Sequence, residues 1–158
     1  MSRFIAFALI FMASGLFAAD REAILNFEME GVRLNMGAQA LTDAIEDNGY
    51  MLESESDESQ DEHWWIYRKS TRRGLDRIYI ESVQGEPRRL LFQIDHALGG
   101  FDVAGAKENL TAVLGEPARC RDMAGRLRCT WQDADVWIAQ LDIDVYPNRA
   151  NYLFKRRR

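Results

Sequence analysis

The feature that most constrains the fold is a run of strict alternation between residues 137 and 145. Apolar residues occupy every second position there and alternate with polar or exposed neighbours: Trp137, Ala139, Leu141, Ile143 and Val145. Successive side chains of a β-strand point to opposite faces, so this period is typical of a strand with one buried face. The odd-numbered residues of this segment are therefore predicted to face the core.

Three further segments have the composition of strands, and short turns separate them. They are 63–69, 76–83 and 88–95, with turns at Arg73-Gly74 and at Gly85-Glu86-Pro87. Connections this short join antiparallel neighbours, so the three segments are predicted to form an antiparallel meander.

Two segments have helical periodicity and clear stop signals. Asn48-Gly49 ends the first, because glycine readily adopts the left-handed conformation. Asp102 is the predicted N-cap of the second, and Gly115-Glu116-Pro117 terminates it. The apolar positions are Ala38, Leu41 and Ile45 in the first helix, and Val103, Ala106, Leu110, Val113 and Leu114 in the second.

The order of these elements predicts the fold class. A strand before the first helix is predicted from the alternation of Leu25, Phe27 and Met29, and a last strand at 152–154. The predicted class is α+β, with helices packed on one face of antiparallel β-meanders. Because helix and meander follow one another twice, two tandem helix-plus-sheet units are a hypothesis, with sub-units at 20–97 and 98–158.

Two cysteines, Cys120 and Cys129, are predicted to form a disulfide across a hairpin. If Ala124-Gly125 is the turn, Met123 pairs with Arg126 and the cysteines face one another within disulfide range. The alternative is a reactive or metal-binding thiol pair, but metal sites favour closer cysteine spacing and further ligands.

Residues 1–19 have the three-part pattern of a secretory signal peptide, with an apolar stretch from Phe4 to Met12 followed by small residues. Cleavage after Ala19 is the first choice, and a cut after Gly15 or Ala18 stays open. A retained membrane tether is the alternative, although a spanning helix needs about 20 apolar residues.

The remaining chain, 20–158, is predicted to be a single domain in the periplasm or secreted, without a transmembrane segment. The net charge of the whole sequence is −5, which argues against a nucleic-acid partner. The acidic segment 53–62 has no apolar residue to bury and is predicted to be a loop or strand edge exposed to water. Its spacing does not match a calcium-binding EF-hand loop, which needs a glycine at its sixth position.

No catalytic pattern stands out. The histidines His63 and His96 accompany no nucleophile motif, and Asp142 and Asp144 are interpreted as a solvated strand face. No metal site and no cofactor are predicted.

Binding signals are stronger. Trp64 and Trp65 are adjacent on a predicted strand, so they point to opposite faces, and tryptophan and arginine dominate interface hot spots. The predicted partner-binding residues are Trp64, Trp65, Tyr67, Arg68, Arg72 and Arg73. The alternative is that the acidic segment or a second sheet covers the outer face.

Arginine is far commoner than lysine, and several arginines lie on the predicted hairpin. Guanidinium groups suit phosphates and carboxylates, so an anionic envelope surface is a second predicted partner, against the alternative of an ordinary solvated hairpin. The predicted anion-binding residues are Arg119, Arg121, Arg126 and Arg128.

The segment 103–131 carries a helix ending in Leu114-Gly115-Glu116-Pro117, then a hairpin, then Thr130-Trp131. This pattern resembles the SmpA/OmlA (BamE-like) family of small envelope proteins, which implies a helix packed on a three-stranded antiparallel sheet. The tandem order is similar to that of secreted beta-lactamase inhibitor proteins. The first half departs from the motif, since Asn48-Gly49-Tyr50 stands in place of the turn, and the family's lipoprotein cysteine is absent.

Two hypotheses on function remain open. The first is a non-catalytic exported protein that binds another protein, as a scaffold or assembly component or as an inhibitor of an extracytoplasmic hydrolase. The second is a small extracytoplasmic enzyme whose active site consists of carboxylate and tyrosine side chains that no sequence motif marks. An exposed aromatic sheet face favours the first, and an apolar cleft around a hydrogen-bonded acid pair favours the second.

Overall fold

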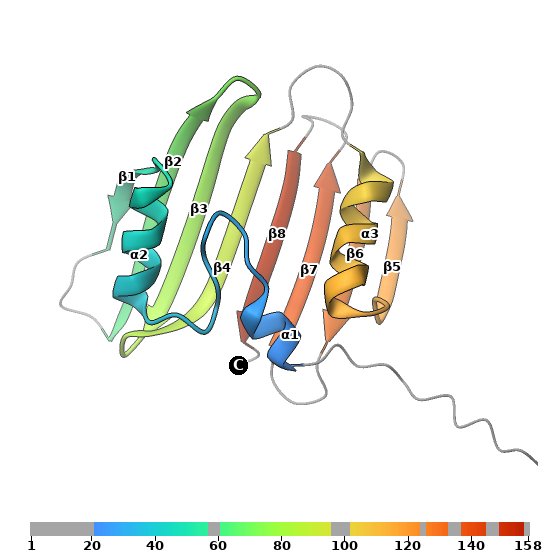
Figure 1. The fold of residues 1–158 in the computed structure, drawn as a ribbon, viewed down its shortest axis with the longest axis horizontal. Coiled ribbons are helices and arrows are strands. Elements are labelled where there is room, and N and C mark those ends of the chain that lie inside the picture. The colour runs from blue at the N-terminus through green and yellow to red at the C-terminus, as the bar shows by residue number, and fades with distance from the viewer. Residues whose placement is uncertain are drawn as a thin grey trace, which may run out of the picture.

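A single antiparallel sheet of eight strands dominates the computed structural model, which describes residues 21–56, 61–95, 102–123, 126–132, 137–144 and 149–156. The strand order is β1-β2-β3-β4-β8-β7-β6-β5 (Figure 1). The strands are β1 (Met51–Glu55), β2 (Glu62–Thr71), β3 (Gly74–Val83), β4 (Glu86–Asp95), β5 (Arg119–Met123), β6 (Arg126–Gln132), β7 (Trp137–Asp144) and β8 (Arg149–Arg156). Two meanders, β1–β4 and β5–β8, therefore meet where β4 pairs with β8.

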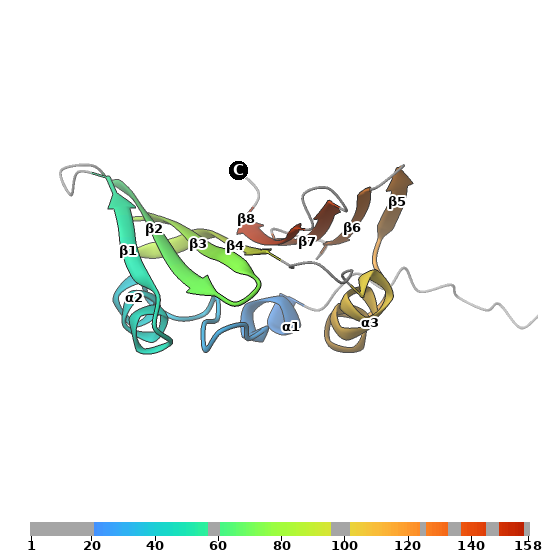
Figure 2. The same cartoon turned by 90° about the horizontal axis from the view of Figure 1, so that it is seen from above.

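The helices lie on one side of this sheet (Figure 2). They are α1 (Arg21–Asn26), α2 (Ala38–Asp47) and α3 (Val103–Leu114). No described helix covers the other side, which we call the open face.

The predicted α+β class of helices packed on separate meanders is wrong. β4 and β8 pair continuously from Arg89↔Lys155 to Asp95↔Arg149, so the hydrogen-bonded ladder does not break between the two halves. The helices have only 6, 10 and 12 residues, and the strands supply most of the ordered structure. The protein is mainly sheet.

The strand predicted from Leu25, Phe27 and Met29 is also wrong. Residues 21–26 form α1 instead, and a tight turn with Gly31 at a φ of 74° follows, closed by the isolated bridge Met29↔Val32. All three alternating residues are partly buried against the core. They reach it from a helix end and an irregular segment, which explains why an apolar alternation here did not mean a strand.

The two other helices confirm their predicted stop and start signals. Gly49 follows the C-cap of α2 with a φ of 80°. The Asp102 carboxylate accepts a hydrogen bond from the Gly105 amide at 2.9 Å and so caps α3. Beyond α3, the indole of the fully buried Trp131 donates to the Gly115 carbonyl at 2.8 Å, which ties the end of the helix to β6.

The core lies between the sheet and the helices. Residues in register across neighbouring strands fill it, so that Trp131, Ala139 and Phe154 form one buried row with Leu90 and Ile80. Of the alternating segment 137–145, Ala139 is buried in this row, and Val145 lies outside the described residues.

The predicted disulfide is confirmed. Cys120 and Cys129 face one another in the β5–β6 ladder and are bonded, with their Cα atoms 4.1 Å apart. Met123 pairs with Arg126 as the hairpin register predicts. The expected turn residues, Ala124-Gly125, lie outside the described part of the chain.

Candidate binding surface

The open face carries an apolar row across its centre. Ile66 on β2, Tyr79 on β3, Leu91 on β4 and Leu153 on β8 are consecutive cross-strand partners, and each is partly exposed. On the water-exposed face of an antiparallel sheet, polar residues normally occupy such positions. Four adjacent strands instead present a continuous apolar strip on the side that no described helix covers.

A mixed row of aromatic and charged residues runs beside it. Trp64, Glu81, Arg89 and Lys155 follow one another across the same four strands. Trp64 is 42% exposed, an unusually open position for the largest side chain. The open face therefore combines apolar contact area with charges of both signs.

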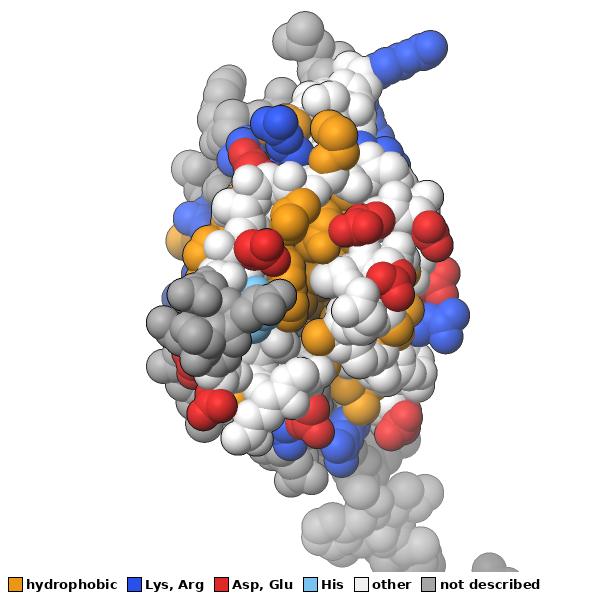
Figure 3. Space-filling view, turned by 90° about the vertical axis from the view of Figure 1, so that its left-hand side faces the viewer, with side chains coloured by type: hydrophobic (Ala, Val, Ile, Leu, Met, Phe, Trp, Pro, Cys, Tyr) orange, Lys and Arg blue, Asp and Glu red, His pale blue; other side chains and the backbone are white. Residues whose placement is uncertain are grey.

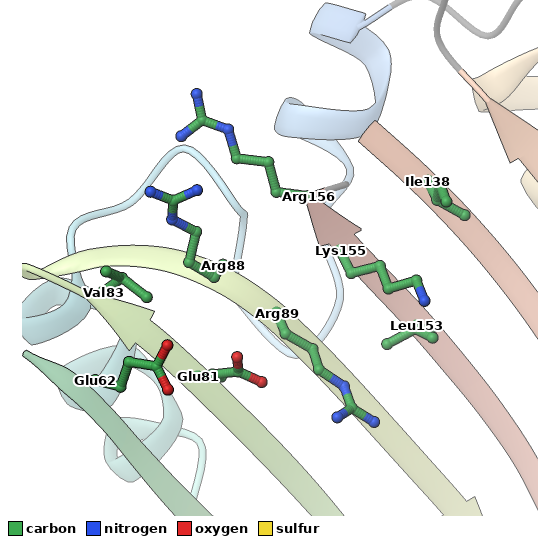
Figure 4. A pocket seen from close by; sticks show the side chains of 9 residues that line it. All are labelled: Glu62, Glu81, Val83, Arg88, Arg89, Ile138, Leu153, Lys155 and Arg156. Atoms are coloured by element: carbon green, nitrogen blue, oxygen red, sulfur yellow. The ribbon is translucent and has the colours of Figure 1, made fainter. Parts of the chain in front are cut away.

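Two adjoining hollows deepen this region. One, of about 420 Å³, lies over the apolar row and is lined by Trp64, Ile66, Tyr79 and Leu91 among others. The other, of about 920 Å³, lies over β4 and β8 and is shown in Figure 4. Both are lined by Glu62, Glu81 and Arg89, so the two hollows adjoin, and together we call them the depression.

The predicted aromatic cluster is divided between the two faces. Trp64 belongs to the open face, whereas Tyr67 is buried on the helix side and its hydroxyl donates to the Glu46 carboxylate of α2 at 3.3 Å. Trp65 also lies on the helix side, with its ring 4.0 Å from that of His63. Trp64 is thus the one member of the aromatic set on the open face.

The arginines of that set lie apart from the hollows. Arg68 is exposed on the open face, two residues beyond Ile66 and opposite Arg77. Arg72 and Arg73 occupy the turn that joins β2 to β3. They are exposed at the end of the hairpin opposite to Trp64.

The predicted anion-binding arginines form two groups. Arg119 and Arg121 are exposed on β5, an outer strand of the sheet. Arg126 and Arg128 instead both donate hydrogen bonds to the carboxylate of Asp142, at distances from 2.5 to 3.1 Å. The interpretation of Asp142 as a solvated residue is wrong, because these arginines cover it and leave it 6% exposed.

Electrostatics at Asp142 follow from this arrangement. Burial by itself would raise the pKa of this carboxyl group, but the hydrogen bonds and charges of Arg126 and Arg128 outweigh it and hold the pKa below its usual range. Asp142 is therefore ionised, and its hydrogen bonds to Arg126 and Arg128 link β7 to β6 on the open face.

A second buried acid lies on the helix side. Asp76 is 3% exposed, and burial raises its pKa, although its carboxylate accepts a hydrogen bond from the Asp95 amide at 3.0 Å. The nearby Tyr50 hydroxyl is buried without a hydrogen-bond partner in the described part of the chain, and burial raises its pKa as well. Neither residue lines the hollows, so this pair does not form the apolar cleft that the enzyme hypothesis requires.

The outer strand β1 exposes further apolar side chains. Met51 and Leu52 are 59% and 44% exposed. Figure 3 looks onto this side of the molecule and shows hydrophobic side chains gathered in a hollow with acidic side chains at its border.

Sequence reasoning missed the centre of the depression, formed by Leu91, Arg89 and Lys155. A usable signal existed for Leu91: because Leu90, Phe92 and Ile94 share one face of the strand, Leu91 must lie on the other, where a polar residue is expected. The approach of Arg89 to Lys155 has no local signal, since it depends on β4 pairing with β8.

Comparison with protein-family models, with curated proteins and with solved structures gave no match to this chain. Within the described ranges, no group of His, Cys, Asp and Glu is placed to hold a metal ion, and no helix has the length and apolar character to cross a membrane.

Proposed function

We propose that this protein is a non-catalytic exported protein that binds a partner protein on the open face of its sheet. The observation that carries the proposal is the apolar row from Ile66 to Leu153, which none of the described elements covers and which the exposed Trp64 flanks. Contiguous exposed apolar surface bordered by polar residues is typical of protein interaction sites.

The shape and composition of the depression favour a protein partner. Its apolar floor and the aromatic anchor Trp64 provide the contacts that dominate binding energy, and the charged row provides a polar rim. A depression that extends over several strands suits a convex protein segment, whereas a flat membrane surface reaches only its rim.

Export is supported by two independent features. The leader pattern at 1–19 is typical of secretory signals, and the disulfide between Cys120 and Cys129 is the kind of bond that persists in oxidising compartments. On this proposal the partner is a protein of the periplasm or of the extracellular medium.

Site-specific photocrosslinking tests the proposal. A photoreactive benzoylphenylalanine replaces Tyr79, in the apolar row, and in a matched control it replaces Asn109, which is exposed on α3 at the opposite side. We expect a discrete crosslinked protein from position 79 in the native envelope and none from position 109. Equal crosslinking from both positions, or a product from position 109 alone, would contradict the proposal.

A second measurement separates a scaffold from an inhibitor. The crosslinked protein is identified by mass spectrometry, purified and mixed with the mature chain. If it is a hydrolase whose activity falls at stoichiometric binding, the chain is an inhibitor. If its activity is unchanged or it has none, the chain acts as a scaffold or assembly component.

A further inference from the structure

The larger hollow has more positive charges than negative charges among its lining side chains. Arg88, Arg89, Lys155 and Arg156 line it, against the two carboxylates Glu62 and Glu81 (Figure 4). Of these cations, Arg156 has an ion-pair partner, Glu86 at 3.6 Å. The remaining three still outnumber the two lining carboxylates, in a protein whose whole sequence has a net charge of −5.

Arg89 and Lys155 are placed where their charges repel. They are direct cross-strand partners on the open face, and like charges in this position are destabilising. Neither forms an ion pair or a side-chain hydrogen bond with the described residues, although Glu81 is the partner of Arg89 on its other side. An external anion between the two side chains would remove the repulsion.

Arg88 adds an independent observation. It is the extra residue of an irregularity in the β3–β4 ladder, where Glu81 pairs with Arg89 and Ser82 pairs with Pro87. Its Nε atom is buried and has no hydrogen-bond partner in the described part of the chain. Because this atom is buried, Arg88 contributes to the hollow through its positive charge and not through this donor.

We infer that this hollow receives an acidic side chain, Asp or Glu, from a convex loop of the partner protein. The carboxylate lies between Arg89 and Lys155, and an apolar neighbour in the same loop packs on the row formed by Leu91, Leu153 and Tyr79. A guanidinium beside a carboxylate forms short, charge-assisted hydrogen bonds. This inference rests on the proposed function and specifies the chemistry of its partner.

A carboxylate fits better than the more highly charged headgroup of an anionic lipid. Glu62 and Glu81 line the same hollow and repel every anion that enters, the more so the higher its charge. The depth of the hollow and its apolar floor also require a ligand that projects, with apolar surface beside its charge.

A selection experiment tests the inference before the partner is identified. A phage library of disulfide-closed peptide loops with about seven randomised positions, comparable in length to common surface loops, is selected against the mature protein. We expect enriched loops with Asp or Glu next to an aromatic or aliphatic residue. Replacing that acid by its amide should weaken binding about tenfold or more. High salt should weaken binding of the acidic loop by a similar factor.

Protein variants provide the controls. The double variant Arg89→Gln/Lys155→Gln should lose the same factor in loop affinity. The control Arg119→Gln removes a positive charge from β5 and should leave the loop affinity unchanged. Melting curves verify that each variant is folded. An undiminished affinity of the double variant would overturn the inference.

The outcomes also separate this inference from the proposed function. Enriched loops that depend on Trp64 and Leu91 but carry no acid would leave the proposed function in place and overturn the inference. Failure to enrich any loop on the open face would count against both. Sedimentation with phosphatidylglycerol and phosphatidylcholine vesicles gives the lipid arm: binding to the anionic vesicles that requires Arg89 and Lys155, with no acidic loop selected, would assign the hollow to lipid and overturn the inference.

Discussion

The carboxylate of Asp142 accepts two hydrogen bonds from the guanidinium of Arg126, at 2.8 and 2.7 Å, across the β6–β7 pair. Arg128 donates to the same carboxylate from the next position on its face of β6. Because the folded state holds the pKa of Asp142 below its unfolded value, this arrangement contributes stability above the unfolded pKa, and the contribution is lost as the pH falls through the folded pKa.

Asp142→Asn should therefore lower the free energy of unfolding at pH 7 by about 1 to 2 kcal/mol, since the two arginines retain partial exposure to water and recover some hydration. The difference from the native protein should shrink as the pH is lowered from 7 to about 2, because the native carboxyl group takes up its proton progressively as the pH falls toward its folded pKa. Urea unfolding at both pH values measures it. A difference independent of pH would show that the charge at position 142 is not what stabilises the fold.

Asp76 should behave in the opposite way. Burial raises its pKa in the folded state, so the stability associated with its neutral form is present below the unfolded pKa and declines as the pH rises through the folded pKa. Asp76→Asn keeps an oxygen that can accept from the Asp95 amide and removes the buried charge.

We expect Asp76→Asn to be at least as stable as the native protein at pH 7 and to lose this advantage at acidic pH. Thermal melts across the pH range suffice. A variant less stable at pH 7 than at pH 4, relative to the native protein, would mean that the ionised carboxylate has a stabilising partner.

The disulfide should stabilise the β5–β6 hairpin through its closed loop. The bonded residues are separated by 9 positions, and the chain-entropy model gives about 2 to 3 kcal/mol for a loop of this size. The double variant Cys120→Ser/Cys129→Ala suits the exposed position 120 and the buried position 129. Its unfolding free energy should match that of the reduced native protein. A native protein equally stable with and without reductant would contradict this account.

The two faces of β2 should respond differently to truncation. Trp64→Ala, at an exposed position, should change the free energy of unfolding by no more than about 0.5 kcal/mol. Tyr67→Ala, at a position only 2% exposed, should reduce it by about 3 to 5 kcal/mol, as other aromatic truncations in cores do. Chemical denaturation of both variants compares them directly, and similar losses would mean that the assigned faces are wrong.

Local signals explain which parts of this fold were predictable. Three features depend on residues close together in the sequence: the helix that Asp102 caps, the helix end at Gly49, and the register of Cys120 opposite Cys129. The union of the halves into one sheet was not predictable in this way. It depends on β4 pairing with β8, which joins residues such as Asp95 and Arg149 that are 54 positions apart.

The candidate site divides along the same line. Strand alternation places Trp64 and Trp65 on opposite faces, but it does not decide which of the two lies on the open face. Arg89 and Lys155 were not found, since each looks like an ordinary exposed cation within its own strand. The irregular position of Arg88 likewise becomes visible only from the pairing of Ser82 with Pro87.

The position of β8 at the centre of the sheet has a consequence for biogenesis. When the ribosome has made β4, the strand that will pair with its free edge is still more than 50 residues away, since Arg149 follows Asp95 by 54 positions. At a synthesis rate of about 5 to 20 residues per second, this edge stays unpaired for several seconds. Nascent chains arrested after Gln132 should accordingly show protease cleavage within β4 that the complete protein resists. The sheet closes only after both halves are available, so every chain that ends before β8 leaves this edge of β4 open to pairing with other strands.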